Sequence, residues 1–207
     1  MASKLEINKG DKIINMVNHL YDIFKHWTYV DGLHKNSVYL IGDPHFNDPD
    51  SKFFRGDNYP GDEEQVKLIN SKVGKNDTII FLGDIWDTEF VKQIRGYKVL
   101  ILGNHDKGAT TYKEVFNEVY EGPLMISDKI ILSHEPVNFD FAFNIHGHVH
   151  GEHQNDNMHF NVCAEHIDYT PVSLNSLVKE GMFKDVPNIH RNTIDRAIIR
   201  KEKKIHG

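Results

Sequence analysis

A near-repeat of short apolar segments, each ending in glycine and then a polar residue, is the feature that most constrains the fold. VYLIGD, IIFLGD and VLILGN share this form, and KIILSH is a fourth variant. Short apolar runs bounded by turn residues are typical of buried strands, so strands are predicted over 37–43, 77–84, 97–104 and 129–134. Helix-like segments alternate with them, which favours an α/β fold whose strand ends meet at one sheet edge.

The segments between these strands have helical spacing of apolar residues or the composition of a loop. Residues 11–26 are predicted as an amphipathic helix, and residues 62–74 as a helix that begins with acidic residues. Residues 44–61, rich in Pro, Gly, Asp and Asn, are a long loop of the kind that lines sites. Further helices are predicted over 88–95, 110–120, 173–181 and from 189 onward, and further strand edges at 144–151 and 158–163.

The length of 207 residues is enough for one domain with a sizeable core, and no linker-like segment divides the chain. We therefore predict a single domain. Residues 1–36 would form an N-terminal helix and lead-in, 37–170 the motif-bearing core, and 171–207 the C-terminal helices. The net charge of -6 argues against a protein whose main role is to coat nucleic acid.

Cysteine content and the absence of long apolar stretches bound the cellular setting. Cys163 is the only cysteine, so an internal disulfide and a thiolate metal cage are both excluded. The N-terminal segment lacks the continuous apolar stretch of a signal peptide, and nowhere do 18 apolar residues follow one another. We therefore expect a cytoplasmic protein with no membrane partner.

Carboxylates, an amide and imidazoles follow the predicted strands or tight glycine turns. Together they offer seven donors without sulfur, a set that suits Mn, Fe, Zn or Ni and is too large for one ion. Two ions that share a bridging carboxylate would account for the number. The candidate ligands are Asp43, His45, Asp84, Asn104, His134, His148 and His150.

Five short motifs occur in a characteristic order along the chain. They are DPH at 43–45, GD at 83–84, GNHD at 103–106, SH at 133–134 and HGHVH at 146–150. Together they resemble the signature blocks of the calcineurin-like metallophosphoesterases, over roughly residues 37–170. The resemblance implies a four-layer α/β/β/α sandwich, in which two facing mixed sheets are flanked by helices.

The resemblance also implies a division of the ligands between two divalent metal ions. One ion would be held by Asp43, His45 and His150, the other by Asn104, His134 and His148, and Asp84 would bridge them. His105 would donate a proton to the leaving oxygen, and Asp106 would orient His105. Two such ions clamp a phosphate and lower the pKa of a bound water, so that hydroxide is available near neutral pH.

Other residues near these motifs have a structural and a functional interpretation. Arg55 and Arg95 could hold a substrate phosphate, or could be solvated or salt-bridged loop residues. Trp86 is interpreted as a packing residue whose ring could flank the site. His146 is left out of the ligand set because it could orient a ligand or be structural. Pro44 departs from the small residue that the family often has there.

The expected function is metal-dependent hydrolysis of a phosphoester bond by a metal-activated hydroxide, with a small phosphodiester as substrate. The alternatives are a phosphomonoesterase or a nuclease at the same site, with nucleic acid as a substrate only, or a non-catalytic metal-binding interaction module of the same fold. Fold-level resemblance does not choose among these substrates.

Overall fold

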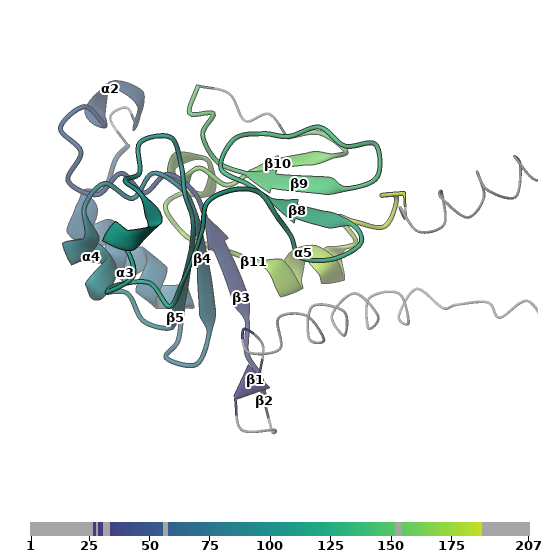
Figure 1. The fold of residues 1–207 in the computed structure, drawn as a ribbon, viewed down its shortest axis with the longest axis horizontal. Coiled ribbons are helices and arrows are strands. Elements are labelled where there is room, and N and C mark those ends of the chain that lie inside the picture. The colour runs from purple at the N-terminus through teal and green to yellow at the C-terminus, as the bar shows by residue number, and fades with distance from the viewer. Residues whose placement is uncertain (1–26, 28, 31–33, 56–57, 152–154, 188–207) are drawn as a thin grey trace, which may run out of the picture.

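A computed structural model describes residues 27, 29–30, 34–55, 58–151 and 155–187 of the chain. The helices predicted over 11–26 and from 189 onward lie outside these residues. Strands β1 (Tyr29–Val30) and β2 (His34–Lys35) pair as a short antiparallel hairpin (Figure 1). Within the described residues, no helix is both long and apolar enough to span a bilayer.

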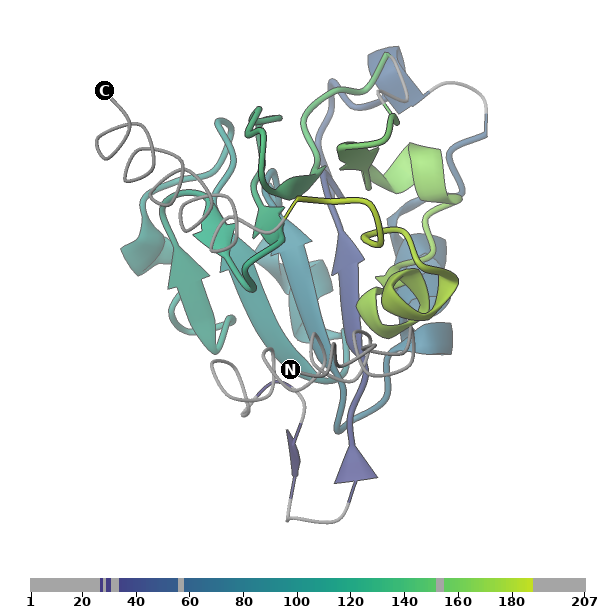
Figure 2. The ribbon, with the colours of Figure 1, turned by 90° about the vertical axis from the view of Figure 1, so that its right-hand side faces the viewer.

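The larger sheet has five strands in the order β11-β3-β4-β5-β6, and its strands β3, β4 and β5, purple to teal, are seen side by side in Figure 2. Strands β3 to β6 are mutually parallel, and β11 is antiparallel to β3. All five residues of β4 are buried, because a central parallel strand is covered on both faces. Their bounds are Val38–Ile41 (β3), Thr78–Leu82 (β4), Tyr97–Ile101 (β5), Glu118–Tyr120 (β6) and Val172–Ser173 (β11).

The second sheet has four strands in the order β10-β9-β8-β7. Strands β8, β9 and β10 are parallel, and β7 is antiparallel to β8. The strand edges predicted at 144–151 and 158–163 are confirmed in their first halves, before the chain turns away. The bounds are Leu124–Met125 (β7), Ile130–Leu132 (β8), Phe143–His146 (β9) and His159–Asn161 (β10).

The described residues contain four α-helices and two short 3-10 segments, which lie between the strands except for α5, which follows the last strand. Helix α3 begins with the predicted acidic turn, and α5 begins at its N-cap Ser173 and ends before Gly181. Helix α2 lies inside the segment predicted as a loop over 44–61. The bounds are Lys52–Arg55 (α2), Asp62–Lys72 (α3), Thr88–Lys92 (α4), Leu174–Glu180 (α5), Ala109–Thr111 (η1) and Ala164–Ile167 (η2).

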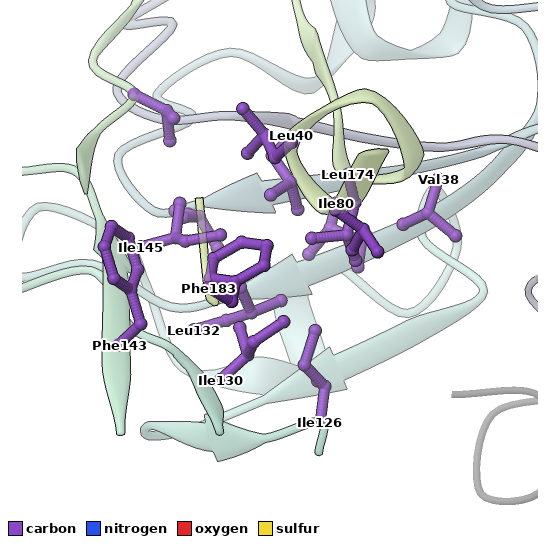
Figure 3. Close-up of a cluster of buried hydrophobic side chains, with 14 of the residues drawn as sticks. Val38, Leu40, Ile80, Ile126, Ile130, Leu132, Phe143, Ile145, Leu174 and Phe183 are labelled. Carbon is purple, nitrogen blue, oxygen red and sulfur yellow. The ribbon is translucent and has the colours of Figure 1, made fainter. Parts of the chain in front are cut away.

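The two sheets face each other across one apolar core. Leu40 and Ile80 of the larger sheet pack in the same buried cluster as Leu132 and Ile145 of the smaller one (Figure 3). The opposite face of the larger sheet packs against α3 and α4, which lie outside it (Figure 1). The predicted α/β sandwich of two facing mixed sheets is therefore confirmed.

The prediction of a helix over 110–120 was wrong. The segment forms η1, a series of turns and then the edge strand β6, which pairs with β5. Tertiary contacts override its helical spacing, because Tyr112 and Phe116 are both used for packing. The Phe116 ring lies edge-on to Phe81 at 5.6 Å, and the Tyr112 hydroxyl donates to Asp106.

Candidate metal centre

The polar residues of the motifs meet where the strands end. Asp43, Asp84 and Asn104 follow β3, β4 and β5, which are parallel neighbours, so their carboxyl ends share one edge of the sheet. His134 follows β8, and His148 and His150 follow β9 in the facing sheet. The structure brings all seven predicted ligands to this edge.

Asp43, His45 and His150 form one group whose donor atoms all lie within 4.8 Å of one another. Within this group, His150 Nε2 lies 3.7 Å from Asp43 Oδ1. Asp43 and His45 are buried, whereas His150 is partly exposed. These are the three residues that the resemblance assigns to one ion.

Asn104, His134 and His148 form a second, tighter group. Asn104 Oδ1 lies 2.8 Å from His134 Nε2 and 3.0 Å from His148 Nδ1, and the two ring nitrogens are 3.1 Å apart. Asp84 lies between the groups, since its Oδ2 is 3.5 Å from His45 Nε2 and 3.5 Å from His134 Nε2. Asp84 thus occupies the position that a bridging carboxylate requires.

Lone pairs converge in this arrangement in a way that suits cations. His134 Nδ1 lies 2.9 Å from the Leu82 carbonyl, so Nδ1 carries the proton and Nε2 presents a lone pair toward Asn104 Oδ1. Asp43 Oδ1 is buried and has no hydrogen-bond partner among the residues described. Carboxylate, amide and imidazole donors arranged in this way fit borderline divalent metals.

Burial keeps two of the candidate ligand imidazoles, His45 and His134, in the form that binds metal. It lowers the pKa of His45 to about 4, with Asp84 opposing the shift, and it also lowers the pKa of His134. Both rings are therefore neutral at pH 7, as metal ligands must be. Burial raises the pKa of Asp43 to about 8, against the charge of His150 and with a contribution from Asp84.

The two turns that carry Asp43 and Asp84 are held together by backbone hydrogen bonds. Asp43 N–H donates to Gly83 O at 3.2 Å, His45 N–H to Asp84 O at 3.0 Å, and Phe46 N–H to Ile85 O at 3.1 Å. The ladder has no bond at residue 44, where proline has no N–H to donate. Proline therefore fits this turn without loss of a backbone bond.

Several site residues have left-handed backbone conformations. The φ angle is 53° at Asp43, 41° at His45, 54° at Asp84 and 69° at His148. Non-glycine residues in this region carry strain and concentrate at functional sites. The glycines of the motifs serve close approach instead, because a Cβ at Gly147 would overlap the Asp43 carboxylate.

Two carboxylates that the sequence interpretation missed hold ligand imidazoles. Asp48 Oδ2 lies 2.8 Å from His45 Nδ1, and Glu165 Oε1 lies 2.6 Å from His150 Nδ1. Such partners fix the tautomer and the ring orientation of a ligand histidine. The position of Asp48, three residues after His45, was a possible signal. Glu165 is brought to the site by the fold alone.

His105 and Asp106 follow Asn104 at the surface of the centre. His105 is exposed, and its N–H donates to Asp84 Oδ1 at 2.9 Å. The Asp106 carboxylate accepts from the backbone N–H groups of Gly103, Asp84 and Ile85, and from the Tyr112 hydroxyl. Asp106 therefore braces both turns, and it could orient His105 only through the backbone.

The two candidate arginines lie in different surroundings. Arg55 is buried, and its guanidinium donates to the carbonyls of Asp43 and Pro44 and stacks on Tyr59 at 4.5 Å. It supports the first ligand turn, because burial commits its donors to backbone oxygens. Arg95 precedes β5, whereas Asn104 follows it, so the whole strand separates Arg95 from the centre.

His146 is buried among structural contacts. Its Nδ1 lies 2.8 Å from the Gly147 carbonyl, and its ring lies 6.2 Å from that of His159. Burial lowers its pKa. This placement is that of a residue supporting the turn on which His148 and His150 lie.

Comparison with known proteins places this fold and site in a class. The family model described as calcineurin-like phosphoesterase matches residues 37–201. An uncharacterised protein of Methanocaldococcus jannaschii is 31% identical over 166 residues, which are 69% of this chain and 89% of that protein. The chain belongs to the calcineurin-like phosphoesterase family, and its candidate metal-binding groups support metal-dependent hydrolysis of phosphoesters in general.

Two solved structures are similar to this fold. A protein of unknown function from Aquifex aeolicus has 25% identity and a TM-score of 0.61, and the match covers 70% of this chain and all of that one. The nuclease MPE of Pseudomonas putida has 23% identity and a TM-score of 0.42, over 55% of this chain and 61% of that one.

Proposed function

We propose that this protein hydrolyses a small phosphodiester with two divalent metal ions. The observation that carries the proposal is the position of Asp84 Oδ2, equally distant from a histidine of each ligand group. Asp43, His45 and His150 would hold one ion, and Asn104, His134 and His148 the other. Mn, Fe, Zn and Ni all suit these donors.

When bound, the ions would supply an activated water and neutralise charge on the phosphoryl oxygens. The protein's own contribution to the reaction then centres on His105. Its ring is exposed next to the ligand groups, with a ring-centroid distance of 5.8 Å to His45. A protonated His105 at this position donates to the leaving oxygen as the ester bond breaks. The hydrogen bond from the His105 N–H to Asp84 Oδ1 fixes the backbone of His105 relative to the carboxylate that would bridge the ions.

The preference for a diester rests on how few cationic side chains are placed to bind a second negative charge of the substrate. A monoester dianion carries one more negative charge than a diester and is usually clamped by additional cations, above all arginine. In the part of the chain that the structure describes, Arg55 is committed to backbone carbonyls and Arg95 lies at the far end of β5. A singly charged diester needs no such clamp.

The test is a side-by-side assay after reconstitution with each metal. The substrates are an aryl phosphomonoester, an aryl phosphodiester, and 2′,3′- and 3′,5′-cyclic nucleotides. Asp84→Ala should lose metal and turnover together, whereas Glu63→Gln, a change at an exposed carboxylate of α3, should retain both. Metal-loaded protein that turns over none of these substrates would favour the non-catalytic interaction module, and a monoester preference would overturn the diester assignment.

A further inference from the structure

Trp86 is an exposed aromatic residue beside the proposed proton donor. Its side chain follows Asp84 by two residues, and 45% of its surface is exposed. The Trp86 and His105 rings are 6.3 Å apart with their planes at 49°. What distinguishes Trp86 from other exposed apolar residues is its place beside His105, where its ring is open to contact with a bound molecule.

The backbone of Trp86 has a conformation that is unfavourable for a bulky residue. Its φ angle is 69°, which is normal for glycine. Residue 86 is held there by the paired turns, where it bridges to Phe46. The chain therefore keeps a tryptophan where a glycine would be more stable, which is the pattern of a residue retained for binding.

A hydrogen bond between the next residues joins the two turns beyond Trp86. Asn47 and Asp87, the residues that follow Phe46 and Trp86 on the paired turns, are joined by a hydrogen bond from Asn47 Nδ2 to Asp87 Oδ2 at 3.1 Å. Asp87 Oδ1 also accepts from the Glu89 N–H as the N-cap of α4, so these polar groups hold the turn on which Trp86 lies. The exposed indole face itself suits a nucleobase, which stacks on aromatic side chains.

We propose that Trp86 stacks on the nucleobase of the leaving group, so that the substrate is a nucleotide phosphodiester whose leaving alcohol is a nucleoside. The inference rests on the proposed function, because His105 defines the side from which the alcohol departs. The ring contact between His105 and Trp86 places the indole where a group attached to the protonated oxygen would extend.

The test uses three matched substrates with metal-loaded protein. One is a deoxyadenosine dinucleotide, and the others carry an abasic tetrahydrofuran residue on the leaving side or on the opposite side. Stacking contributions of a base predict a kcat/KM roughly 5- to 150-fold lower when the leaving side is abasic. The opposite abasic substrate should differ little from the dinucleotide. Equal kcat/KM values for all three would overturn the inference and leave the proposed function intact.

Variants separate stacking from a structural role. Trp86→Gly accepts the left-handed backbone, so it should fold with an equal or higher Tm while the ratio between base-bearing and abasic substrates falls to about 1. Trp86→Phe should keep most of that ratio. Phe139→Gly removes an aromatic of similar exposure before β9, at the opposite end of that strand from the centre, and should leave the ratio unchanged. An unchanged ratio in Trp86→Gly would refute the assignment.

Binding can be measured even if no diester is hydrolysed. The chain has two tryptophans, and Trp27 is fully buried, so a quenched emission reports on Trp86. Adenosine 5′-monophosphate should quench saturably, ribose 5-phosphate should not, and Trp86→Phe should abolish the effect. Quenching without turnover would retain base binding and reject the hydrolytic proposal, whereas no quenching by the nucleotide would reject base binding.

Discussion

Glu165 offers a selective way to perturb one of the two ligand groups. Its Oε1 accepts from His150 at 2.6 Å, and its Oε2 is buried without a hydrogen-bond partner among the described residues. Glu165→Gln keeps an acceptor but removes the charge, and Glu165→Ala frees the His150 ring to rotate. We expect each change to weaken one metal site and to spare the site of Asn104, His134 and His148.

The size of the effect follows from the kind of contact. Loss of a partner that orients a ligand histidine typically costs 10- to 100-fold in metal affinity, which corresponds to about 1.4 to 2.8 kcal/mol. Glu165→Gln should fall near the lower value and Glu165→Ala near the upper one. The assay is calorimetric titration of metal-free protein with Mn²⁺ or Zn²⁺, fitted to two sites.

A carboxylate–histidine pair away from the centre supplies the control. Asp156 Oδ1 lies 3.0 Å from His159 Nδ1 before β10, away from the ligand-bearing strand ends, so Asp156→Asn should leave both affinities unchanged. Equal weakening of both sites by Glu165→Gln, or no weakening of either, would refute an orienting role. Complete loss of one site would indicate that Glu165 is itself a ligand.

Three further outcomes follow from the same geometry. His105→Ala should retain both ions by calorimetry yet lose about 10²- to 10⁴-fold in kcat, because it removes only the proton donor. Arg55→Met should lower the free energy of unfolding by roughly 1 to 3 kcal/mol in denaturant titrations, since two buried carbonyls lose their donor. Metal-free protein should lose Tm as the pH rises from 6.5 to about 8. Burial raises the folded pKa of Asp43 to about 8 from 3.8, so stability present at low pH is lost as this carboxyl ionises. The unfolded His45, with its ordinary pKa of 6.5, is still partly protonated at the lower end of this range, so its opposing contribution fades as the pH approaches 8. Added metal should remove most of this loss, as scanning calorimetry would show.

The sequence was most informative where local signals and tertiary structure agree. Residues 78–82 read as a strand because a central parallel strand is apolar throughout, and the glycine-carboxylate ending marked Asp84. The seven candidate ligands could be predicted because each belongs to a short motif. Their roles as ligands remain predictions, although the fold brings them together.

Errors arose where contacts between distant segments decide the outcome. Residues 110–120 have helical spacing, yet Tyr112 is fixed by its bond to Asp106 and Phe116 by its packing on Phe81. Arg55 stays a candidate phosphate ligand by residue type, and only the folded structure shows its donors on the carbonyls of Asp43 and Pro44. Glu165 is in no motif, so only the structure identifies it as the partner of His150.

Cys163 lies beside the centre, and its Sγ is within 4.8 Å of donor atoms of His150 and Glu165. Its thiol donates to Asp43 Oδ2 at 3.3 Å, and burial raises its pKa, with the charge of Asp43 adding to the effect. Thiol alkylation and oxidation both proceed through the thiolate. The centre should therefore tolerate iodoacetamide and mild peroxide, although a sulfur atom lies against one of the candidate ligands.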